Sequence, residues 1–271
     1  MDILDAAHES TQPSLVVLGS RGSIPVSGAK YTRFGGNTTS IAIEQDGLAA
    51  TFIDAGTGIN AYEEHGLVLS DQLSIFLTHY HWDHIQGLSM LGDMWGGDCI
   101  VEIWGSDDPK ASLSGAIRPP WFPVSLAGQD NVFYRPIEGV VHRGSVQLTP
   151  FTVNHPGGAL GYRIEGPGAV VLVVTDHEQV EGAVLKIPEG HVDVVIYDAQ
   201  YLPSEMDGRR GWGHSSWKDA TTFASEVDAD RLILTSHDPG RSDDAIDAIV
   251  GAAQEMFPAT EAARPGMRIS L

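Results

Sequence analysis

Cysteine is almost absent from this chain, which has Cys99 alone among its 271 residues. One cysteine cannot form an internal disulfide, which fits the reducing conditions of the cytoplasm. Cys99 itself is expected to be a small buried hydrophobic residue. Long apolar runs are absent too: none approaches the about 20 residues that span a bilayer, and residues 1–5 do not begin a secretory signal. We therefore expect a cytoplasmic location and no membrane partner.

Basic residues are scarce. The sequence has 16 lysines and arginines against 36 aspartates and glutamates, which gives a formal net charge of −20. A surface this acidic repels phosphate backbones, and long nucleic acids bind through basic patches. Extended DNA or RNA is therefore an unfavourable partner. A small anionic substrate stays compatible, because bound metal ions reverse the electric field around them.

One short segment is dense in side chains that bind metals. Directly after the apolar run at 73–77 come His79, His81, Asp83 and His84. Imidazole nitrogens and carboxylate oxygens are ligands that Zn²⁺ and similar divalent ions accept. A strand that ends in such a cluster places the ligands at the carboxyl edge of a sheet, where α/β proteins usually keep their chemistry. The alternative is a surface loop that happens to be rich in histidine.

The spacing within this cluster favours two ions. His79 and His81 are two residues apart, so on an extended chain they point to the same side and can share one metal. A turn or helix start just after His81 would direct Asp83 and His84 toward a second ion. This pattern predicts a two-metal hydrolytic site, in which the ions lie about 3.5–4 Å apart.

Residues 1–271 are expected to form one domain, with a polar arm at 1–13. Helical patterns occur at 59–65, 216–227 and 242–256, and another helix is expected to start at 107–111. Short apolar strands are predicted in two batches, at 15–18, 39–44, 49–53 and 74–78, and at 99–104, 145–153, 169–175, 192–197 and 231–235. This order predicts two sheets packed face to face, with helices on the outer sides.

Residues 95–143 form a long excursion that is rich in proline and holds tryptophans at 95, 104 and 121. Long irregular segments in a compact domain are often functional. We expect this one near the site mouth, as a lid or a substrate wall. An ordinary insertion and a subunit interface are open alternatives.

Three further ligand-type residues each follow a predicted strand. His155 follows the strand that ends at 153, Asp176 follows 170–175, and His237 follows 232–236. Any one of them alone would more often be a hydrogen-bonded loop residue. Their recurrence at strand ends is what a metal site built along one sheet edge predicts.

Together these motifs resemble the metallo-β-lactamase fold superfamily, over nearly the whole chain from Leu15 to His237. The family's HxHxDH signature stands here as His79, His81, Asp83 and His84, and the turns at 19–23 and 52–58 also resemble the family's. The resemblance implies an α/β (α+β) fold, a four-layer αββα sandwich of two mixed sheets flanked by helices. It implies two divalent metal ions, one on His79, His81 and His155, the other on Asp83, His84 and His237, with Asp176 bridging them.

The ligand types admit Zn²⁺, Mn²⁺ and Fe, and of these Zn²⁺ is the expected ion. Homodimers are common in the family, so a homodimer is a possible assembly.

A narrower resemblance points to the phosphodiesterase branch, which includes ribonuclease Z, cyclic-nucleotide phosphodiesterases and the cyclic phosphodiesterase of phosphonate breakdown. The motifs at 35–39, 197–201 and 213–216 carry it. It implies that His214 assists the leaving group and that Asp198 supports it. The alternative for His214 is a neighbour of the N-cap of the helix at Ser216. Only 20 residues separate His155 from Asp176 (176 − 155 = 21 steps), too few for the arm with which ribonuclease Z grips transfer RNA.

We therefore expect hydrolysis of a small phosphodiester or cyclic nucleotide by a hydroxide held between two metals. Asp176 and Asp83 would orient that hydroxide, and His214 would protonate the departing alkoxide. Asn37 and the backbone at Gly36 are expected to position the phosphate. Asp54 is expected to attach the first sheet to the segment at 79–84, called the ligand loop below.

Two other functions stay open. The same metal site could hydrolyse a carboxylic ester, lactone, thioester or β-lactam. An aromatic pocket of Trp95, Trp121 and Trp212 would suit such a substrate. A binding module that retains the fold without activity is the third reading. The sequence does not name the physiological substrate.

Overall fold

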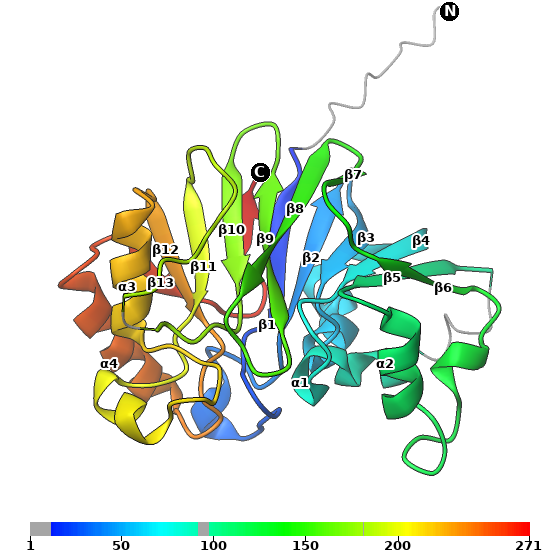
Figure 1. Cartoon of the computed structure of the whole chain (residues 1–271), viewed down its shortest axis with the longest axis horizontal. Coiled ribbons are helices and arrows are strands. Elements are labelled where there is room, and N and C mark those ends of the chain that lie inside the picture. Colours follow the sequence, from blue (N-terminus) through cyan, green and yellow to red (C-terminus); the bar gives the residue numbers. More distant parts are fainter. Residues whose placement is uncertain (1–11, 92–97, 181) are drawn as a thin grey trace, which may run out of the picture.

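Two mixed seven-stranded sheets face each other in the computed structural model, which describes residues 12–91, 98–180 and 182–271 (Figure 1). In the first sheet, β3, β4, β5 and β6 are parallel and the remaining pairs are antiparallel. Its strands, in spatial order, are β14 (Arg268–Ser270), β1 (Ser14–Gly19), β2 (Ser40–Gln45), β3 (Leu48–Ile53), β4 (Val68–Phe76), β5 (Ile100–Gly105) and β6 (Val132–Pro136).

In the second sheet, β10 to β13 are parallel and β7 to β10 are antiparallel. Its strands, in spatial order, are β13 (Thr260–Ala262), β12 (Arg231–Thr235), β11 (Val194–Asp198), β10 (Val170–Val174), β9 (Ala159–Glu165), β8 (Val146–Val153) and β7 (Val141–Arg143). Strands β8, β10, β11 and β12 consequently run in one direction, so the loops that follow them emerge at one edge.

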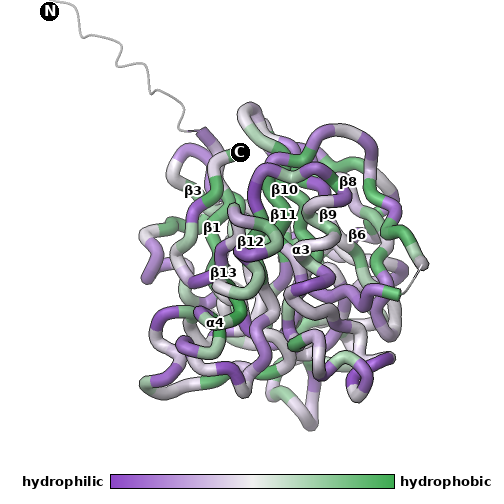
Figure 2. The backbone as a smooth tube through the Cα atoms, turned by 90° about the vertical axis from the view of Figure 1, so that its left-hand side faces the viewer, coloured by the Kyte–Doolittle hydropathy of each residue, from purple (hydrophilic) through white to green (hydrophobic). Residues whose placement is uncertain are grey.

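Side chains alternate between the two faces of each strand, which separates an inner apolar layer from the outer ones. Leu15 and Val17 of β1 belong to the apolar layer between the two sheets, whereas Val16 and Leu18 pack on the outer side. This is the period-two pattern of a strand that is covered on both faces. Figure 2 shows hydrophobic residues along the strands and hydrophilic ones in the outer loops.

Helices cover both outer faces. α1 (Trp82–Ile85) and α2 (Pro109–Ala116) lie on the first sheet, and α3 (Trp217–Glu226) and α4 (Asp243–Gln254) on the second (Figure 1). Ser216 and Ser242 cap α3 and α4 by accepting a backbone N–H with the side chain, as N-cap serines do. The 3₁₀ helices are Ala29–Tyr31, Thr57–Ala61, Glu63–His65, Gln86–Met90, Leu126–Gly128 and Pro203–Gly208.

The predicted sandwich is confirmed. The strand predicted at 99–104, in the second batch, is β5 and belongs to the first sheet, and the other predicted strands differ only at their ends. The helix predicted at 59–65 is two 3₁₀ helices, separated at Tyr62. The strand predicted at 74–78 starts at Val68 and ends at Phe76, because the ligand loop leaves the sheet there. Of the excursion at 95–143, residues 95–97 lie outside the described residues, as does most of the expected polar arm. The rest is not irregular throughout, since β5 and β6 extend the first sheet and α2 packs on it.

The two sheets are attached to each other at the edge where the ligand loops emerge. The hydroxyl of Tyr162 on β9 donates to the carbonyl of Leu77 at 2.7 Å, and the N–H of Leu160 donates to the carbonyl of Thr78 at 2.9 Å. The second sheet therefore holds the start of the ligand loop directly. None of the helices in the described part of the chain has the length and hydrophobicity of a transmembrane span.

Candidate metal centre

The ligand loop turns after His81, as the spacing of its ligand-type residues predicts. His81 is extended, with φ −65° and ψ 152°, and it is the N-cap of α1, so the chain changes direction immediately after it. His79 and His81 therefore precede the turn, while Asp83 and His84 lie on the helix. Asp83 and His84 are both buried, which places their polar groups inside the protein rather than in solvent.

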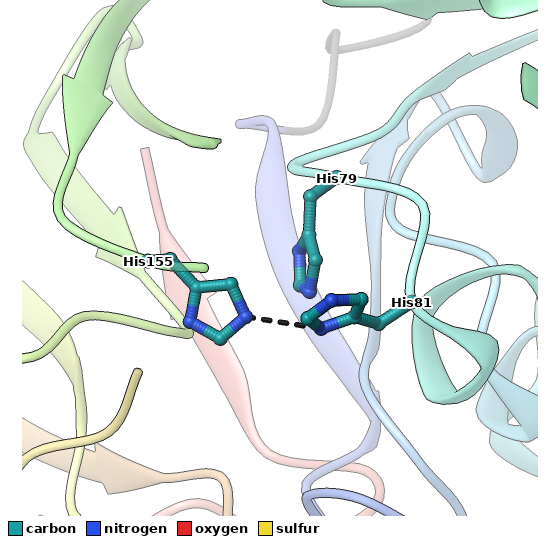
Figure 3. A group of neighbouring side chains, drawn as sticks. All are labelled: His79, His81 and His155. Carbon is teal, nitrogen blue, oxygen red and sulfur yellow. Dashed lines mark hydrogen bonds between the residues drawn. The ribbon is translucent and has the colours of Figure 1, made fainter. Parts of the chain in front are cut away.

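His79, His81 and His155 form the first group of ligand atoms. One nitrogen from each ring lies within 4.8 Å of the others, and His81 Nδ1 is 3.0 Å from His155 Nε2. Figure 3 shows the three rings turned toward one another, two from the loop after β4 and one from the loop after β8. Three imidazoles that converge from two sheets are a suitable ligand set for Zn²⁺.

His79, His84 and Asp176 form a second group, also within 4.8 Å. Asp176 lies between the two groups. Its Oδ1 is 3.2 Å from His84 Nε2, and its Oδ2 is 3.8 Å from both His79 Nε2 and His155 Nε2. Asp176, a member of the second group, therefore also approaches His155 of the first, and such a carboxylate can bridge two ions.

Ligand atoms at the centre of these groups make no hydrogen bond within the described part of the protein. Among the described residues, His79 Nε2, His84 Nε2 and Asp176 Oδ1 are buried and have no hydrogen bond. A buried polar atom without a partner typically destabilises a protein by about 1–3 kcal/mol. Divalent cations would satisfy all three atoms at once, so the residues present fit the metal that the motif implies.

Asp83 and His237 differ in how they relate to this centre. Asp83 Oδ2 lies 3.5 Å from His84 Nε2 and also accepts the N–H of Ser23 at 2.7 Å. Neither Asp83 nor His237 belongs to the two groups of described residues, and His237, which was expected beside Asp83 and His84, has another partner. Its Nε2 is engaged instead by the carbonyl of Ala263 at 3.0 Å, and burial lowers its pKa to about 4.

Asp54 fixes the orientation of His84. Its carboxylate accepts the N–H of Thr78 at 2.7 Å and the Thr78 hydroxyl, and it lies 2.7 Å from His84 Nδ1. Asp54 has φ 58°, a left-handed conformation that is rare for a residue with a side chain and that these bonds stabilise. With Nδ1 committed to a carboxylate, Nε2 is the nitrogen left for a metal.

His214 faces the centre and is held by Asp198. Its Nδ1 lies 2.8 Å from Asp198 Oδ2, and its Nε2 lies 3.9 Å from Asp176 Oδ2. Asp198 also accepts the N–H groups of His177 and Gln200, which fixes the carboxylate in turn. The cap of α3 is formed by Ser216 and Asp219 without the His214 ring, so the alternative of a simple N-cap neighbour does not account for this orientation.

Burial and the neighbouring charges shift the pKa values within the centre. Burial lowers the pKa of His214, but the Asp198 and Asp176 carboxylates outweigh burial and raise it to about 9. Burial raises the pKa of Asp198 to about 6. Burial would also raise the pKa of Asp176, but the charges of His84 and His214 hold it well below its ordinary value.

Glu178 is a site residue that the sequence pattern did not reveal. Its carboxylate accepts the N–H groups of Gly211 and Gly213 at 2.8 and 2.9 Å, and the carbonyl of Gly213 in turn is 2.8 Å from His155 Nδ1. Glu178 thus attaches the loop before His214 to a ligand of the first group. The sequence feature that could have revealed Glu178 is its position two residues after Asp176.

Gly36 and Asn37 lie in a tightly packed loop. A Cβ on Gly36 would be 1.8 Å from the carbonyl oxygen of Val26, so only glycine fits there. The side-chain oxygen of Asn37 accepts the Thr57 hydroxyl at 3.2 Å, and its carbonyl accepts the N–H of Ser20. These contacts attach the loop to the end of β1 and to the 3₁₀ helix that starts at Thr57, and the expected positioning of phosphate stays a prediction.

The expected aromatic pocket is arranged differently. Trp95 lies outside the described residues. Trp121 and Trp82 line one cavity of about 200 Å³, whereas the guanidinium of Arg209 stacks on Trp212 at 4.7 Å. A larger cavity, of about 540 Å³, adjoins Asn154 and His177.

A model of the beta-lactamase superfamily domain matches residues 51–237 of the chain. Ribonuclease BN of Escherichia coli O7:K1 is 25% identical over 314 residues, covering 92% of this chain and 97% of the relative. Ribonuclease BN of Cronobacter sakazakii is 24% identical over 250 residues, covering 73% and 81%.

Solved structures share the fold. The metallo-beta-lactamase fold protein YhfI from Bacillus subtilis superposes with a TM-score of 0.74 at 17% identity, covering 96% of this chain and all (100%) of that one. A diphosphatase from the PhnP family gives 0.69 at 18% identity, covering 96% and 98%. The short form of human tRNase Z gives 0.65 at 18% identity, covering 95% and 98%. The chain therefore belongs to the beta-lactamase superfamily and is a hydrolase.

Proposed function

We propose that this hydrolase is a metal-dependent phosphodiesterase that acts on a small phosphodiester such as a cyclic nucleotide. The observation that carries the proposal is the His214–Asp198 pair, which directs a ring nitrogen toward the ligand centre. Cleavage of a phosphodiester releases an alkoxide, and a histidine placed there can protonate it. Relatives named as a ribonuclease and similar structures named as a diphosphatase and a tRNase Z support a phosphate ester as substrate.

Two divalent ions, of which we favour Zn²⁺, would be held by His79, His81 and His155 and by His84 and Asp83, with Asp176 between them. When bound, such ions lower the pKa of a coordinated water and neutralise charge on the phosphate oxygens. Asp176 lies within 4 Å of ring nitrogens from both groups, so its carboxylate is placed to orient an attacking water.

His214 would supply the proton to the leaving group. As the water oxygen bonds to phosphorus and the bond from phosphorus to the ester oxygen breaks, the proton on Nε2 passes to that oxygen. The ring then regains a proton from the one that the added water releases. Asp198, bonded to Nδ1 at 2.8 Å, keeps the ring in the tautomer that carries this proton and stabilises the charged ring beforehand. The ring nitrogen and the carboxylate therefore act as a positioned acid.

Two features support a small substrate over transfer RNA. The net charge of −20 opposes the approach of a long polyanion. Between the ligands His155 and Asp176 the chain folds into the antiparallel strands β9 and β10, with no added arm. A substrate with a single phosphate and a compact body needs neither a basic surface nor an arm.

An assay with defined metals tests the proposal against the rival hydrolysis of carboxylic esters. The protein is loaded with Zn²⁺ or Mn²⁺, its metal content is measured, and bis(p-nitrophenyl) phosphate is compared with a lactone, a thioester and a β-lactam. We expect turnover of the phosphodiester and at least one ion per chain. Turnover of the carboxylic substrates alone would refute the phosphodiesterase proposal and support the rival. A metal content below one ion per chain would contradict the two-metal arrangement.

A further inference from the structure

A cavity of about 200 Å³ opens beside the ligand loop, between α1 and the end of α2. One wall comes from α1 and the 3₁₀ helix after it, and the other from α2 and the loop that follows. Figure 1 shows these two helices side by side. The lining residues are Trp82, Ile85, Gln86, Ser89, Ala116, Ile117, Trp121 and Phe122.

Trp82 belongs both to the lining of this cavity and to the ligand loop. Trp82 is the first residue of α1, directly between His81 of the first group and Asp83, which contacts His84 of the second. The same short helix therefore sets the position of the ligands and of one cavity wall. Along the chain, the cavity lining and the metal ligands are thus immediate neighbours at Trp82.

Two tryptophans of the lining are largely exposed. Trp82 is 58% exposed and Trp121 is 65% exposed, although tryptophan carries a large apolar surface that folding normally buries. The hydrophobic layer beneath them is already filled by the buried side chains of Ile85 and Ile117. The tryptophan rings are consequently not needed to complete the core.

The polar groups around these rings indicate the chemistry of the ligand. The guanidinium of Arg118 lies 4.9 Å from the centroid of the Trp121 ring, and Gln86 and Ser89 add an amide and a hydroxyl to the lining. An alkyl chain would use none of these groups. A flat heterocycle can stack on an indole ring and accept or donate hydrogen bonds at its edge.

We propose that this cavity binds the planar base of a nucleotide substrate while the phosphodiester lies at the metal centre. The proposal rests on the proposed function and narrows its substrate class to nucleoside phosphodiesters. A neutral base meets no repulsion from the acidic surface. Trp82 and Trp121 supply the stacking surfaces, so they determine specificity and take no part in bond cleavage.

Two esters with the same leaving group test this. The p-nitrophenyl ester of thymidine monophosphate carries a base, and methyl p-nitrophenyl phosphate does not. For the metal-loaded protein we expect a KM at least about tenfold lower for the thymidine ester, since stacking of one base on an aromatic ring has about this effect or more. Trp82→Ala and Trp121→Ala should each remove most of that difference, and Trp82→Phe should retain it. Phe133→Ala, which removes an exposed aromatic side chain on β6 outside the cavity lining, is the matched control.

The outcomes separate the two proposals. Equal KM values for both esters in the unaltered protein would overturn the base site, as would equal changes for both esters in Trp82→Ala. If neither ester is cleaved, the phosphodiesterase proposal fails. A binding measurement then tests separately whether the cavity binds a base. Calorimetric titration with thymidine monophosphate and methyl phosphate should then show a preference for the nucleotide that Trp121→Ala abolishes; no preference would overturn the inference.

Discussion

Asp54 and His84 are joined by a 2.7 Å contact between a carboxylate oxygen and Nδ1, and this leaves His84 Nε2 directed at Asp176. The contact connects the end of β3 to the helix α1, and both groups are completely buried. The protein thus stabilises one ring orientation before any metal binds.

Asp54→Asn should weaken metal binding by about 10- to 100-fold, because the amide no longer provides a charged partner for His84 Nδ1. Competition with a chromophoric chelator measures the Zn²⁺ dissociation constant. Asp71→Asn, an exposed change on β4, is the control and should leave it unchanged. An unaltered dissociation constant in Asp54→Asn would show that the carboxylate does not support the metal site.

His214→Ala should lower kcat by about 10²- to 10⁴-fold for phosphodiesters with alkoxide leaving groups. The loss should be much smaller for p-nitrophenyl esters, because p-nitrophenolate departs without a proton. Steady-state kinetics on both kinds of ester, together with metal content, measure this. A parallel loss of activity and metal would recast His214 as a structural residue.

Glu178→Gln should lower kcat by about tenfold, since small displacements of catalytic groups have effects of this order or larger. The carboxylate accepts two backbone N–H groups in the loop before His214, and glutamine offers one accepting oxygen at the same place. Kinetics and metal analysis are compared with those of Glu189→Gln, whose side chain is exposed to solvent. Normal kcat in Glu178→Gln would rule out a positioning role.

Gly213→Ala should destabilise the protein by about 1–3 kcal/mol and reduce its metal content. The new Cβ would lie 2.2 Å from His155 Nδ1, at a residue with φ 87°. Gly251→Ala in α4 is the control, because a Cβ there meets no atom within 4 Å and should stabilise the helix by up to about 1 kcal/mol. Urea unfolding and metal analysis distinguish the two variants. Equal effects would contradict a close approach at His155.

Removing the metal should lower the Tm by about 10 °C. An ion present at a thousand times its Kd stabilises the folded state by about 4 kcal/mol, which corresponds to a shift of this order in a chain of this length. Calorimetry before and after chelation, and again after adding Zn²⁺, measures it. His79→Ala, which removes a ligand atom from both groups, should have a Tm that barely responds to Zn²⁺. A chelator-insensitive Tm in the unaltered protein would contradict tight binding.

Much of the fold was predictable because most strands carry an apolar pattern of their own. Alternating or continuous apolar runs located most strands of both sheets, and serines 216 and 242 marked the starts of α3 and α4. Strands β6, β7, β9, β13 and β14 were missed. In β9, Gly161 and Arg163 interrupt the apolar pattern, and packing against β8 and β10 decides the strand instead.

The candidate site was predictable in its ligand types and less so in its partners. His79, His81, Asp83 and His84 stand out by density alone, and their turn at His81 follows from spacing. The roles of Glu178 and Trp82 depend on which loops meet in space, which no local pattern encodes. The same holds for His237, whose ring nitrogen is engaged by a carbonyl on a distant loop.

The ligands come from both sheets, His79, His81 and His84 from the first and His155 and Asp176 from the second. Neither half of the chain can therefore assemble the centre alone, and the order of events in folding is constrained. Each sheet must form and the two must dock before the full ligand set exists. Metal capture should consequently be a late step, and a bound ion should oppose separation of the two halves, so that loss of the ion and opening of the sandwich become one cooperative event.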